Sequence, residues 1–261
     1  MIVGVQKGGT TTLYSWLSQH PSISAPKTKE LHFFDSHVHK NYVEYEKQFP
    51  IRTLKKLITY DATPRYLYFP SAPLKIKCYN PNTKFIVLLR NPSYRAFSAY
   101  KMYERFQENG HLMDRFKRHE QEDATQRIYS LMYKNDFPSF SKCVELELNQ
   151  LSTNQFIEPS IVRRGYYKFQ IENYFKYFNK SQFLFIQSEK MQEKPFEIYQ
   201  SVLEFLNLKC DQKHPIDFNN KNAYEYTFSF DEKATLEMLS QHYKKVNNGL
   251  GDLIGKTITW E

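Results

Sequence analysis

The first seventeen residues constrain the fold more than any other stretch, because an apolar segment, a glycine turn and a helical pattern follow one another directly. Met1 to Val5 is short, apolar and β-branched, as expected of a buried strand. A turn from Gly8 to Thr12 follows, and Leu13, Trp16 and Leu17 then recur at the spacing of one helix face. This stretch therefore predicts a strand, a glycine loop and a helix.

Two later apolar runs repeat the strand pattern. Phe85 to Leu89 and Phe183 to Ile186 are continuous apolar segments, typical of strands in a parallel sheet that is covered on both faces. Helical patterns lie near residues 94–100, 166–178, 195–206 and 232–246. The alternation predicts an α/β fold, a single doubly wound domain with a central parallel sheet over residues 1–261. The polar segment 104–159 predicts a helical insertion or lid.

The charge balance favours anionic ligands. The chain has 36 Lys and Arg against 28 Asp and Glu, a formal net charge of +8. No block of like charge stands out, so we do not expect nucleic acid as a partner. The apolar runs are too short to span a bilayer, so we expect no stable membrane insertion. The cysteines Cys78, Cys143 and Cys210 form no CxxC pair, which disfavours a zinc site and a disulfide framework.

The loop after the first predicted strand has the composition of a phosphate site. Its glycines let backbone N–H groups approach an anion, and the following helix directs its positive end toward it. A lysine adds a full charge, and three threonines add hydroxyl donors. The candidate anion-binding residues are Lys7, Gly8, Gly9, Thr10, Thr11 and Thr12. The alternative is a tight turn between strand and helix that binds nothing.

This loop is not a Walker A loop, which needs a lysine directly after its last glycine. Here Lys7 precedes the glycine pair, and Arg90 stands where a kinase or NTPase would place a carboxylate for Mg²⁺. The pattern indicates a nucleotide held by basic residues, with no metal. A P-loop kinase, the alternative, would bind ATP together with Mg²⁺.

Arg90 and Ser98 form a second candidate anion site. Arg90 follows the carboxyl end of a predicted strand, where ligands bind in open α/β sheets. Ser98 is eight residues further on, about two helical turns. A guanidinium and a hydroxyl suit a terminal phosphate monoester; the alternative is an arginine and a serine with structural roles only. Two separated anion sites fit one nucleotide with phosphates at its 5′ and 3′ positions.

These motifs resemble those of sulfotransferases that use PAPS (3′-phosphoadenosine 5′-phosphosulfate). Residues 3–13 resemble the 5′-phosphosulfate loop of that family, and residues 85–100 resemble its 3′-phosphate motif. Other segments are similar to the branch that contains heparan sulfate 3-O-sulfotransferases and their bacterial relatives. These segments are 29–35, 63–66, 164–167, 189–191, 253–255 and Trp260. The resemblance covers nearly the whole chain and is thin between residues 104 and 159.

The resemblance implies a P-loop-like fold and an enzyme that moves a sulfuryl group from PAPS to a hydroxyl or amine, leaving PAP. The implied acceptor is a carbohydrate, and the segment 104–159 would lie on the acceptor side. Glu30 matches the catalytic base, His32 a nearby active-site histidine, and Lys7 the residue that stabilises the leaving phosphate. Arg90, Ser98 and Tyr166 would contact the donor. The residues expected to contact the acceptor are Lys29, Asp35 and Arg65.

The neighbours of Glu30 lead to an electrostatic expectation. A carboxylate among Leu31, Phe33 and Phe34 would be desolvated, which would raise its pKa and make it a stronger base. The alternative is a surface carboxylate beside Lys29. Two other functions stay open: a sulfotransferase for a small hydroxylated metabolite or lipid, and a nucleotide-binding module without catalysis.

The chain departs from the animal glycan enzymes in its last third. Their cysteine-bridged loop and Lys-Gly-Arg segment are not found between Asn219 and Lys233, and Ser71 stands where they have a lysine. Donor contacts from that region are therefore not predicted. No signal-peptide pattern is evident, which favours the cytoplasm; the Golgi lumen is the alternative if the chain is a trimmed catalytic domain. The sequence makes no prediction about oligomeric state.

Overall fold

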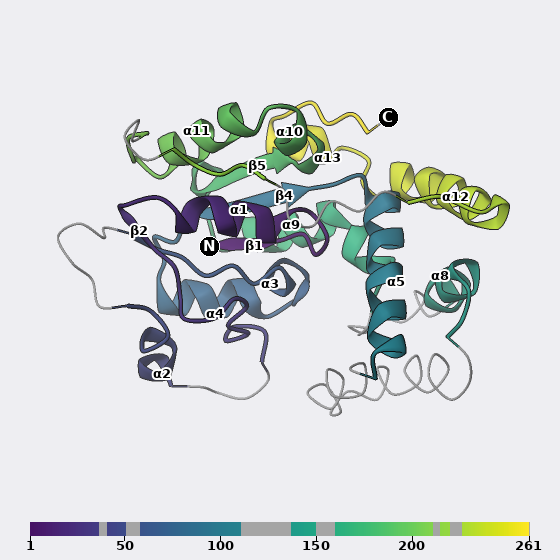
Figure 1. Cartoon of the computed structure of the whole chain (residues 1–261), viewed down its shortest axis with the longest axis horizontal. Coiled ribbons are helices and arrows are strands. Elements are labelled where there is room, and N and C mark those ends of the chain that lie inside the picture. The colour runs from purple at the N-terminus through teal and green to yellow at the C-terminus, as the bar shows by residue number, and fades with distance from the viewer. Residues whose placement is uncertain are drawn as a thin grey trace.

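The computed structural model describes residues 1–36, 41–50, 58–110, 137–149, 160–210, 215–219 and 226–260 (Figure 1). A central sheet is enclosed by helices, and a group of helices stands at one end of it. Of the predicted insertion 104–159, the structure describes residues 104–110 and 137–149, which include the end of α5 (Pro92–Glu108) and the whole of α8 (Phe140–Asn149). Residues 111–136 and 150–159 lie outside the described residues, so the lid stays a prediction.

The central sheet of the described residues is parallel. It has the order β1-β4-β5, with β1 at Ile2–Gly4, β4 at Phe85–Leu89 and β5 at Phe183–Gln187. These strands match the three predicted apolar runs. Every residue of β4 is buried, as a central strand covered on both faces should be. The predicted α/β fold with a central parallel sheet is confirmed.

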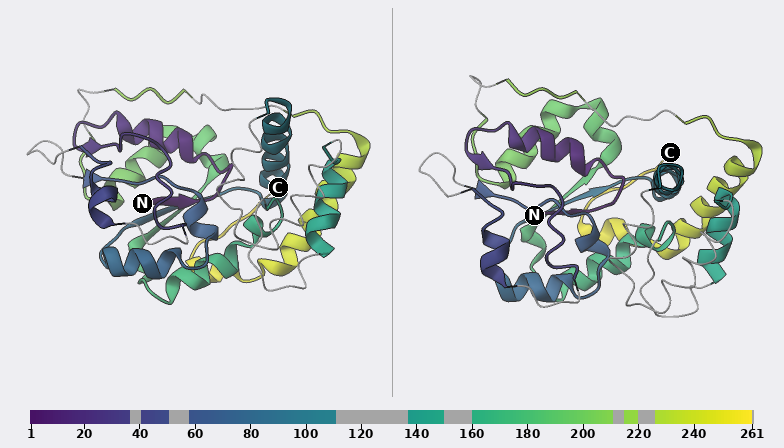
Figure 2. Two further views of the ribbon diagram at one scale, coloured as in Figure 1. Left: turned by 90° about the horizontal axis from the view of Figure 1, so that it is seen from below. Right: turned by 60° about the horizontal axis from the view of Figure 1, so that its bottom comes forward.

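Side chains from β4 point alternately into two separate cores. Val87 and Leu89 pack with one set of helices, and Ile86 and Leu88 pack with the other. The first set consists of α3 (Arg65–Tyr68), α4 (Ala72–Tyr79), α9 (Tyr167–Phe175) and α13 (Leu250–Ile254). The second set consists of α1 (Thr10–Ser18), α10 (Ser188–Glu193) and α11 (Pro195–Phe205). Figure 2 shows purple α1 and green α11 on one side of the sheet, with blue α4 and teal α9 on the other.

A third core lies beside the sheet, where α5 (Pro92–Glu108), α8 (Phe140–Asn149) and α12 (Phe230–Val246) pack together. Phe97 of α5 lies at the centre of this core, 1% exposed, and meets the ring of Phe140 edge-on. Figure 1 shows α5 beyond the ends of β1 and β4, with α8 and α12 behind it. This arrangement places one helix of the third core next to the loops that leave the sheet.

Shorter elements complete the described fold. β2 (Ile23–Ser24) and β3 (Ile58–Thr59) form a small parallel pair, and an isolated parallel bridge joins Ile2 to Ala62. The remaining elements are α2 (Tyr42–Glu46) and the single-turn helices η2 (Arg163–Gly165) and η3 (Lys180–Gln182). The bridge matters most for the site, because it runs residues 61–63 alongside β1. Sequence patterns missed these elements because each is too short to show a period.

Candidate active site

The predicted site residues converge on one edge of the sheet. Parallel strands all end at the same edge, so the segments that follow them become neighbours there. Lys7 follows β1, Arg90 follows β4, and Ser188 follows β5. Arg65 follows the bridged segment 61–63 beside β1. We call this edge, where residues 5–9, 63–65, 90–91 and 188–189 lie, the carboxyl edge.

The loop of residues 5–9 is held against the sheet by backbone contacts. The Gly8 N–H donates to the Val5 carbonyl over 2.9 Å, and the Ser188 hydroxyl donates to the Gly8 carbonyl over 2.6 Å. A Cβ at Gly8 would lie 2.7 Å from Val5 Cγ2 and 3.2 Å from the Leu88 carbonyl oxygen. Glycine is therefore required there by close packing, whereas at Gly9 it is required by the left-handed backbone, φ 89°.

The three threonines of the loop differ in exposure. Thr10 and Thr12 are buried in the first turn of α1, and Thr11 is exposed. Lys7 itself has φ 67°, a left-handed conformation that non-glycine residues seldom adopt. Such backbone strain, of the order of 1–3 kcal/mol, is concentrated at functional sites in proteins. The strain at Lys7 thus agrees with the functional reading of this loop.

Arg90 and the Lys7 loop form one connected unit. Arg90 Nη1 donates to the Lys7 carbonyl oxygen over 2.9 Å, and the Tyr167 hydroxyl donates to the Arg90 carbonyl over 2.8 Å. The next backbone N–H, of Asn91, donates to Glu189 Oε1 over 2.8 Å. The strand ends of β1, β4 and β5 are therefore tied together at the carboxyl edge by hydrogen bonds.

The cations of this unit are electrostatically unfavourable. Burial lowers the pKa of Lys7 to about 8, and the charges of Arg105 and Arg90 act in the same direction. Burial also lowers the pKa of Arg90, although the nearby Glu189 carboxylate opposes this effect. A negatively charged ligand in this place would stabilise both cations.

Ser98 and Tyr166 have hydrogen-bond partners that are distant in the sequence. Ser98 is 2% exposed, and its Oγ lies 3.1 Å from the hydroxyl of Tyr226. The Tyr166 hydroxyl lies 2.5 Å from His242 Nε2. No local pattern reveals either pair, because Tyr226 and His242 are more than seventy residues away along the chain.

On the other side of β1, Glu30 belongs to a network of alternating charges. Lys29 Nζ donates to Glu30 Oε1 over 2.9 Å, and His32 Nε2 lies 3.4 Å from Glu30 Oε2. The other ring nitrogen of His32, Nδ1, lies 2.7 Å from Asp35 Oδ2. Arg65 Nη1 donates to the Asp35 carbonyl oxygen over 2.6 Å and lies 3.4 Å from its carboxylate. The structure thus brings together five predicted residues in one chain of contacts.

This network sets the protonation states of its members. Burial alone would lower the pKa of His32, but hydrogen bonds with Asp35 and Glu30 raise it to about 9. Burial would raise the pKa of Glu30, but the hydrogen bond with His32 and the charge of Lys29 outweigh it and lower the pKa to about 2. The pKa of Asp35 is lowered against the effect of its own burial by His32 and Arg65.

The expected increase in the pKa of Glu30 is therefore wrong. Its aromatic neighbours do not surround the carboxylate: Phe33 and Phe34 pack into the core, 8% and 1% exposed. The side chain of Glu30 is 36% exposed and is paired with two cationic groups. Charge pairing outweighs desolvation, which the sequence could not indicate without the position of His32.

Buried polar contacts fix this segment beside β1. The Leu31 N–H donates to Thr63 Oγ1, and the Phe33 N–H donates to the Tyr66 hydroxyl. Both hydroxyls donate in turn to Asp61, over 2.7 Å each. Asp61 is 1% exposed and precedes the carboxyl edge. The sequence does not single out Asp61, because a lone aspartate in an unassigned segment gives no signal.

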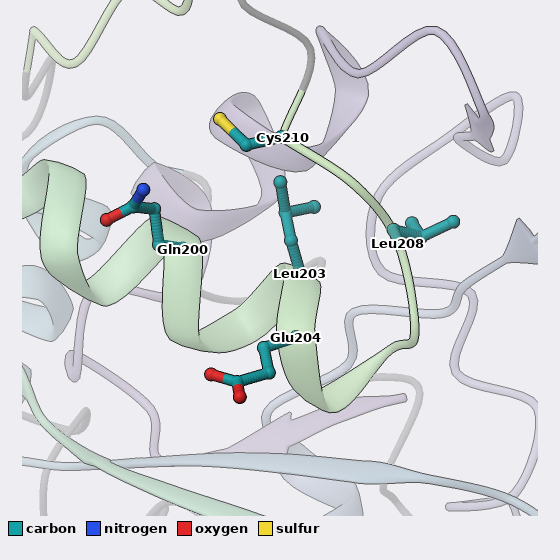
Figure 3. A pocket seen from close by; sticks show the side chains of 5 residues that line it. All are labelled: Gln200, Leu203, Glu204, Leu208 and Cys210. Carbon is teal, nitrogen blue, oxygen red and sulfur yellow. The ribbon is translucent and has the colours of Figure 1, made fainter.

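A surface hollow on α11 lies away from this site. It has a volume of about 380 Å³ and is lined by Gln200, Leu203, Glu204, Leu208 and Cys210 (Figure 3). Lys84, which precedes β4, donates to the carbonyl of Phe205. This contact puts the end of α11, and with it the hollow, at the opposite edge of the sheet.

The structure also bears on cysteine pairing, metal ligands and membrane-spanning helices. None of the three cysteines is bonded to another, and all three lie in the described part of the chain. Within the described ranges, no group of His, Cys, Asp and Glu side chains is arranged to hold a metal ion. Every described helix is too short or too polar to cross a lipid bilayer.

Comparisons with known proteins agree with this geometry. The sequence profile of the sulfotransferase domain matches residues 1–251, and the chain therefore belongs to the sulfotransferase domain family. Its relatives include heparan sulfate glucosamine 3-O-sulfotransferase 3B1 of Mus musculus, 31% identical over 80% of this chain and 46% of the relative. Another is heparan sulfate glucosamine 3-O-sulfotransferase 6 of Homo sapiens, 32% identical over 80% of this chain and 52% of the relative. The chain thus spans about half the length of these relatives.

A solved structure has the same fold. The sulfotransferase from Alicyclobacillus acidocaldarius superimposes with a TM-score of 0.72 over 98% of this chain and 95% of that protein, at 24% sequence identity. The predicted resemblance to the sulfotransferase family is thereby confirmed, both in sequence and in fold.

Proposed function

We propose that this chain transfers a sulfuryl group from PAPS to a hydroxyl or amine of a carbohydrate, and that residues 1–261 act as a single domain. The observation that carries the proposal is the connection between the two cationic loops, in which Arg90 Nη1 donates to the Lys7 carbonyl oxygen over 2.9 Å. PAPS carries phosphate groups at both ends of its ribose. A protein that binds it needs two cationic sites at a fixed separation, and the hydrogen bond fixes these two.

The buried cations support binding of this doubly phosphorylated donor. The pKa values of Lys7 and Arg90 are both lowered by burial, so a bound anion would stabilise their charged forms. We assign the 5′-phosphosulfate to the loop with Lys7, Gly8, Gly9, Thr10, Thr11 and Thr12. We assign the 3′-phosphate to Arg90 and Ser98, with Tyr166 as a further donor contact.

Lys7 is the proposed electrostatic catalyst. Sulfuryl transfer is an in-line displacement like phosphoryl transfer, and negative charge accumulates on the oxygen that leaves with the phosphate. An ammonium group in a partly dehydrated loop stabilises such charge more strongly than it would in water. No step of this reaction requires a metal.

Glu30 is the proposed base. With a pKa of about 2 its carboxylate is ionised at neutral pH, so it can accept a hydrogen bond from an acceptor hydroxyl. Lys29 and His32 reduce its basicity as long as both contact it. An acceptor hydroxyl that takes the place of Lys29 at Oε1 would increase that basicity, while His32 keeps the other oxygen in position.

The remaining members of the network have supporting roles in this proposal. Asp35 and Arg65 are 4% and 6% exposed, and Arg65 contacts Asp35, which contacts His32. We therefore assign them to positioning His32, in place of the acceptor contact that the sequence suggested. Lys29, once released from Glu30, would contact the acceptor. A carbohydrate with negative charge fits the net charge of +8 and the names of the relatives, which act on heparan sulfate glucosamine.

The test is PAPS-dependent labelling of a panel of acidic polysaccharides, neutral glycans and small alcohols. We expect label in acidic polysaccharide, at a rate that falls with increasing salt. Glu30→Gln should reduce turnover by about 10²–10⁴-fold, the usual contribution of a general base, and leave PAP affinity unchanged. Glu44→Gln is the matched control, because Glu44 is 64% exposed and pairs with Lys47, three residues away.

Each possible failure points to a different part of the proposal. Full turnover in Glu30→Gln would show that another group accepts the proton. Label in small alcohols alone would exclude the carbohydrate acceptor. Wild-type protein that fails to bind PAP would exclude the donor, and with it the whole proposal.

A further inference from the structure

Tyr226 lies next to the proposed 3′-phosphate site, although its sequence position gave no indication of this. It belongs to the segment that leads into α12, and its hydroxyl lies 3.1 Å from Ser98 Oγ on α5. The same segment, residues 219–233, is the one without the Lys-Gly-Arg sequence of the animal glycan enzymes. Tyr226 thus brings a hydroxyl from a distant part of the chain to a predicted anion-binding residue.

Aromatic packing fixes the direction of this hydroxyl. The Tyr226 ring meets Phe97 edge-on, with centroids 5.2 Å apart and an angle of 85° between the planes. Phe228 packs against Phe97 as well, at 4.9 Å. Since Phe97 is 1% exposed and immediately precedes Ser98 on α5, the ring is anchored directly beside the serine hydroxyl. Packing alone would be served equally well by a phenylalanine.

Tyr226 is also close to Arg90. Its phenol is among the groups that act on the pKa of the Arg90 guanidinium, together with Glu189 and Tyr167. Tyr226 therefore connects the two residues of the proposed 3′-phosphate site, since it contacts Ser98 directly and lies near Arg90.

We propose that Tyr226 is a binding residue for the 3′-phosphate of the nucleotide, acting together with Arg90 and Ser98; this inference rests on the proposed function. A phosphate monoester has three terminal oxygens, each a strong hydrogen-bond acceptor. The guanidinium supplies charge and two directed N–H groups, and the two hydroxyls supply further donors. Either hydroxyl can donate across the contact between Ser98 and Tyr226, so the pair can reorient toward an anion.

The test compares two nucleotides that differ only in the 3′-phosphate. Calorimetry with PAP and with adenosine 5′-phosphate is carried out on the wild-type chain and on Tyr226→Phe, which keeps the ring and removes the hydroxyl. We expect Tyr226→Phe to weaken PAP binding about ten- to hundredfold, as for loss of a hydrogen bond to a charged group. Binding of adenosine 5′-phosphate should not change.

Tyr100→Phe is the matched control. Tyr100 lies on α5 in the same aromatic core, and its hydroxyl donates to Glu104 and to the carbonyl of Pro138. This variant should bind PAP like the wild type. Ser98→Ala provides a second measurement: if Ser98 and Tyr226 hold the same phosphate, the double variant should lose less affinity than the sum of the single losses.

The outcomes separate this inference from the proposed function. If the wild type binds PAP no more tightly than adenosine 5′-phosphate, the donor assignment itself is wrong. If the wild type discriminates and Tyr226→Phe discriminates equally well, the role of Tyr226 is wrong and the donor assignment stands. Equal weakening of both nucleotides by Tyr226→Phe would also overturn the inference, because the effect would then be on the fold.

Discussion

The two halves of the candidate active site carry charge in opposite ways: a donor half around Lys7 and Arg90, and an acceptor half around Glu30 and His32. In the proposed donor half, Lys7 and Arg90 have the same sign, and burial lowers the pKa of each. In the proposed acceptor half, charges alternate, so that the pKa of His32 is raised while that of Glu30 is lowered. The burial of its charges is unfavourable in the first half, whereas in the second half the charges stabilise one another.

This difference indicates where a ligand contributes most. An anion in the donor half would offset the cost of burying like charges. A bound donor should therefore stabilise the folded protein. In the acceptor half, a ligand has to compete with ion pairs that already exist, such as the contact between Lys29 and Glu30. We therefore expect tight binding of the donor and weaker, more salt-sensitive binding of the acceptor.

Removal of the Lys7 charge should have the largest effect on the donor half. Lys7→Met should lower kcat/KM for PAPS-dependent transfer by about 10²–10³-fold, the usual loss when one group that stabilises transition-state charge is removed. Steady-state kinetics with saturating acceptor measure this loss. Lys27→Met, at an exposed lysine, should keep the wild-type rate. Equal rates for the two variants would remove Lys7 from the mechanism.

Proton uptake provides a direct test of the unfavourable charge on Lys7. Because its pKa is about 8 in the free protein, the amine is about half protonated at pH 8. Bound PAP should raise that pKa, so binding should take up roughly half a proton at pH 8 and less as the pH falls toward 6. Calorimetry in two buffers with different ionisation enthalpies measures the uptake. If Lys7→Met takes up as many protons as the wild type, the protons come from another group.

In the acceptor half, where opposite charges pair, we expect a smaller effect, a change in stability with pH. Because the pKa of His32 is raised from 6.5 to about 9, its contribution to stability is complete below pH 6.5 and is lost as pH rises through 9. Asp35→Asn should therefore lower the Tm more at pH 6 than at pH 10. An NMR titration of Asp35→Asn should show a His32 pKa closer to its ordinary value than in the wild-type chain.

The exposed Asp231 offers a control for this last comparison. It lies in the first turn of α12, outside the acceptor half. Asp231→Asn should change the Tm by the same small amount at pH 6 and at pH 10. A His32 signal that titrates near 6.5 in the wild-type chain would contradict the proposed network.

Much of the site could be predicted because its parts are local. The loop from Lys7 to Thr12 and the position of Arg90 depend on where strands end, and continuous apolar runs show those ends in the sequence. The segment around Glu30 was recognised by resemblance alone. The pairs Ser98–Tyr226 and Tyr166–His242 could not be predicted, because each joins residues that are close only after the third core has packed.

The sequence by itself determined the α/β alternation, the glycine loop and the cation after β4, since these depend on neighbours within a few residues. Only the tertiary structure decided the protonation of Glu30, because the charge pairs around its carboxylate outweigh burial by an amount that depends on their distances. It also decided which side chains share the carboxyl edge, because parallel strands bring the residues after them together regardless of the length of chain between.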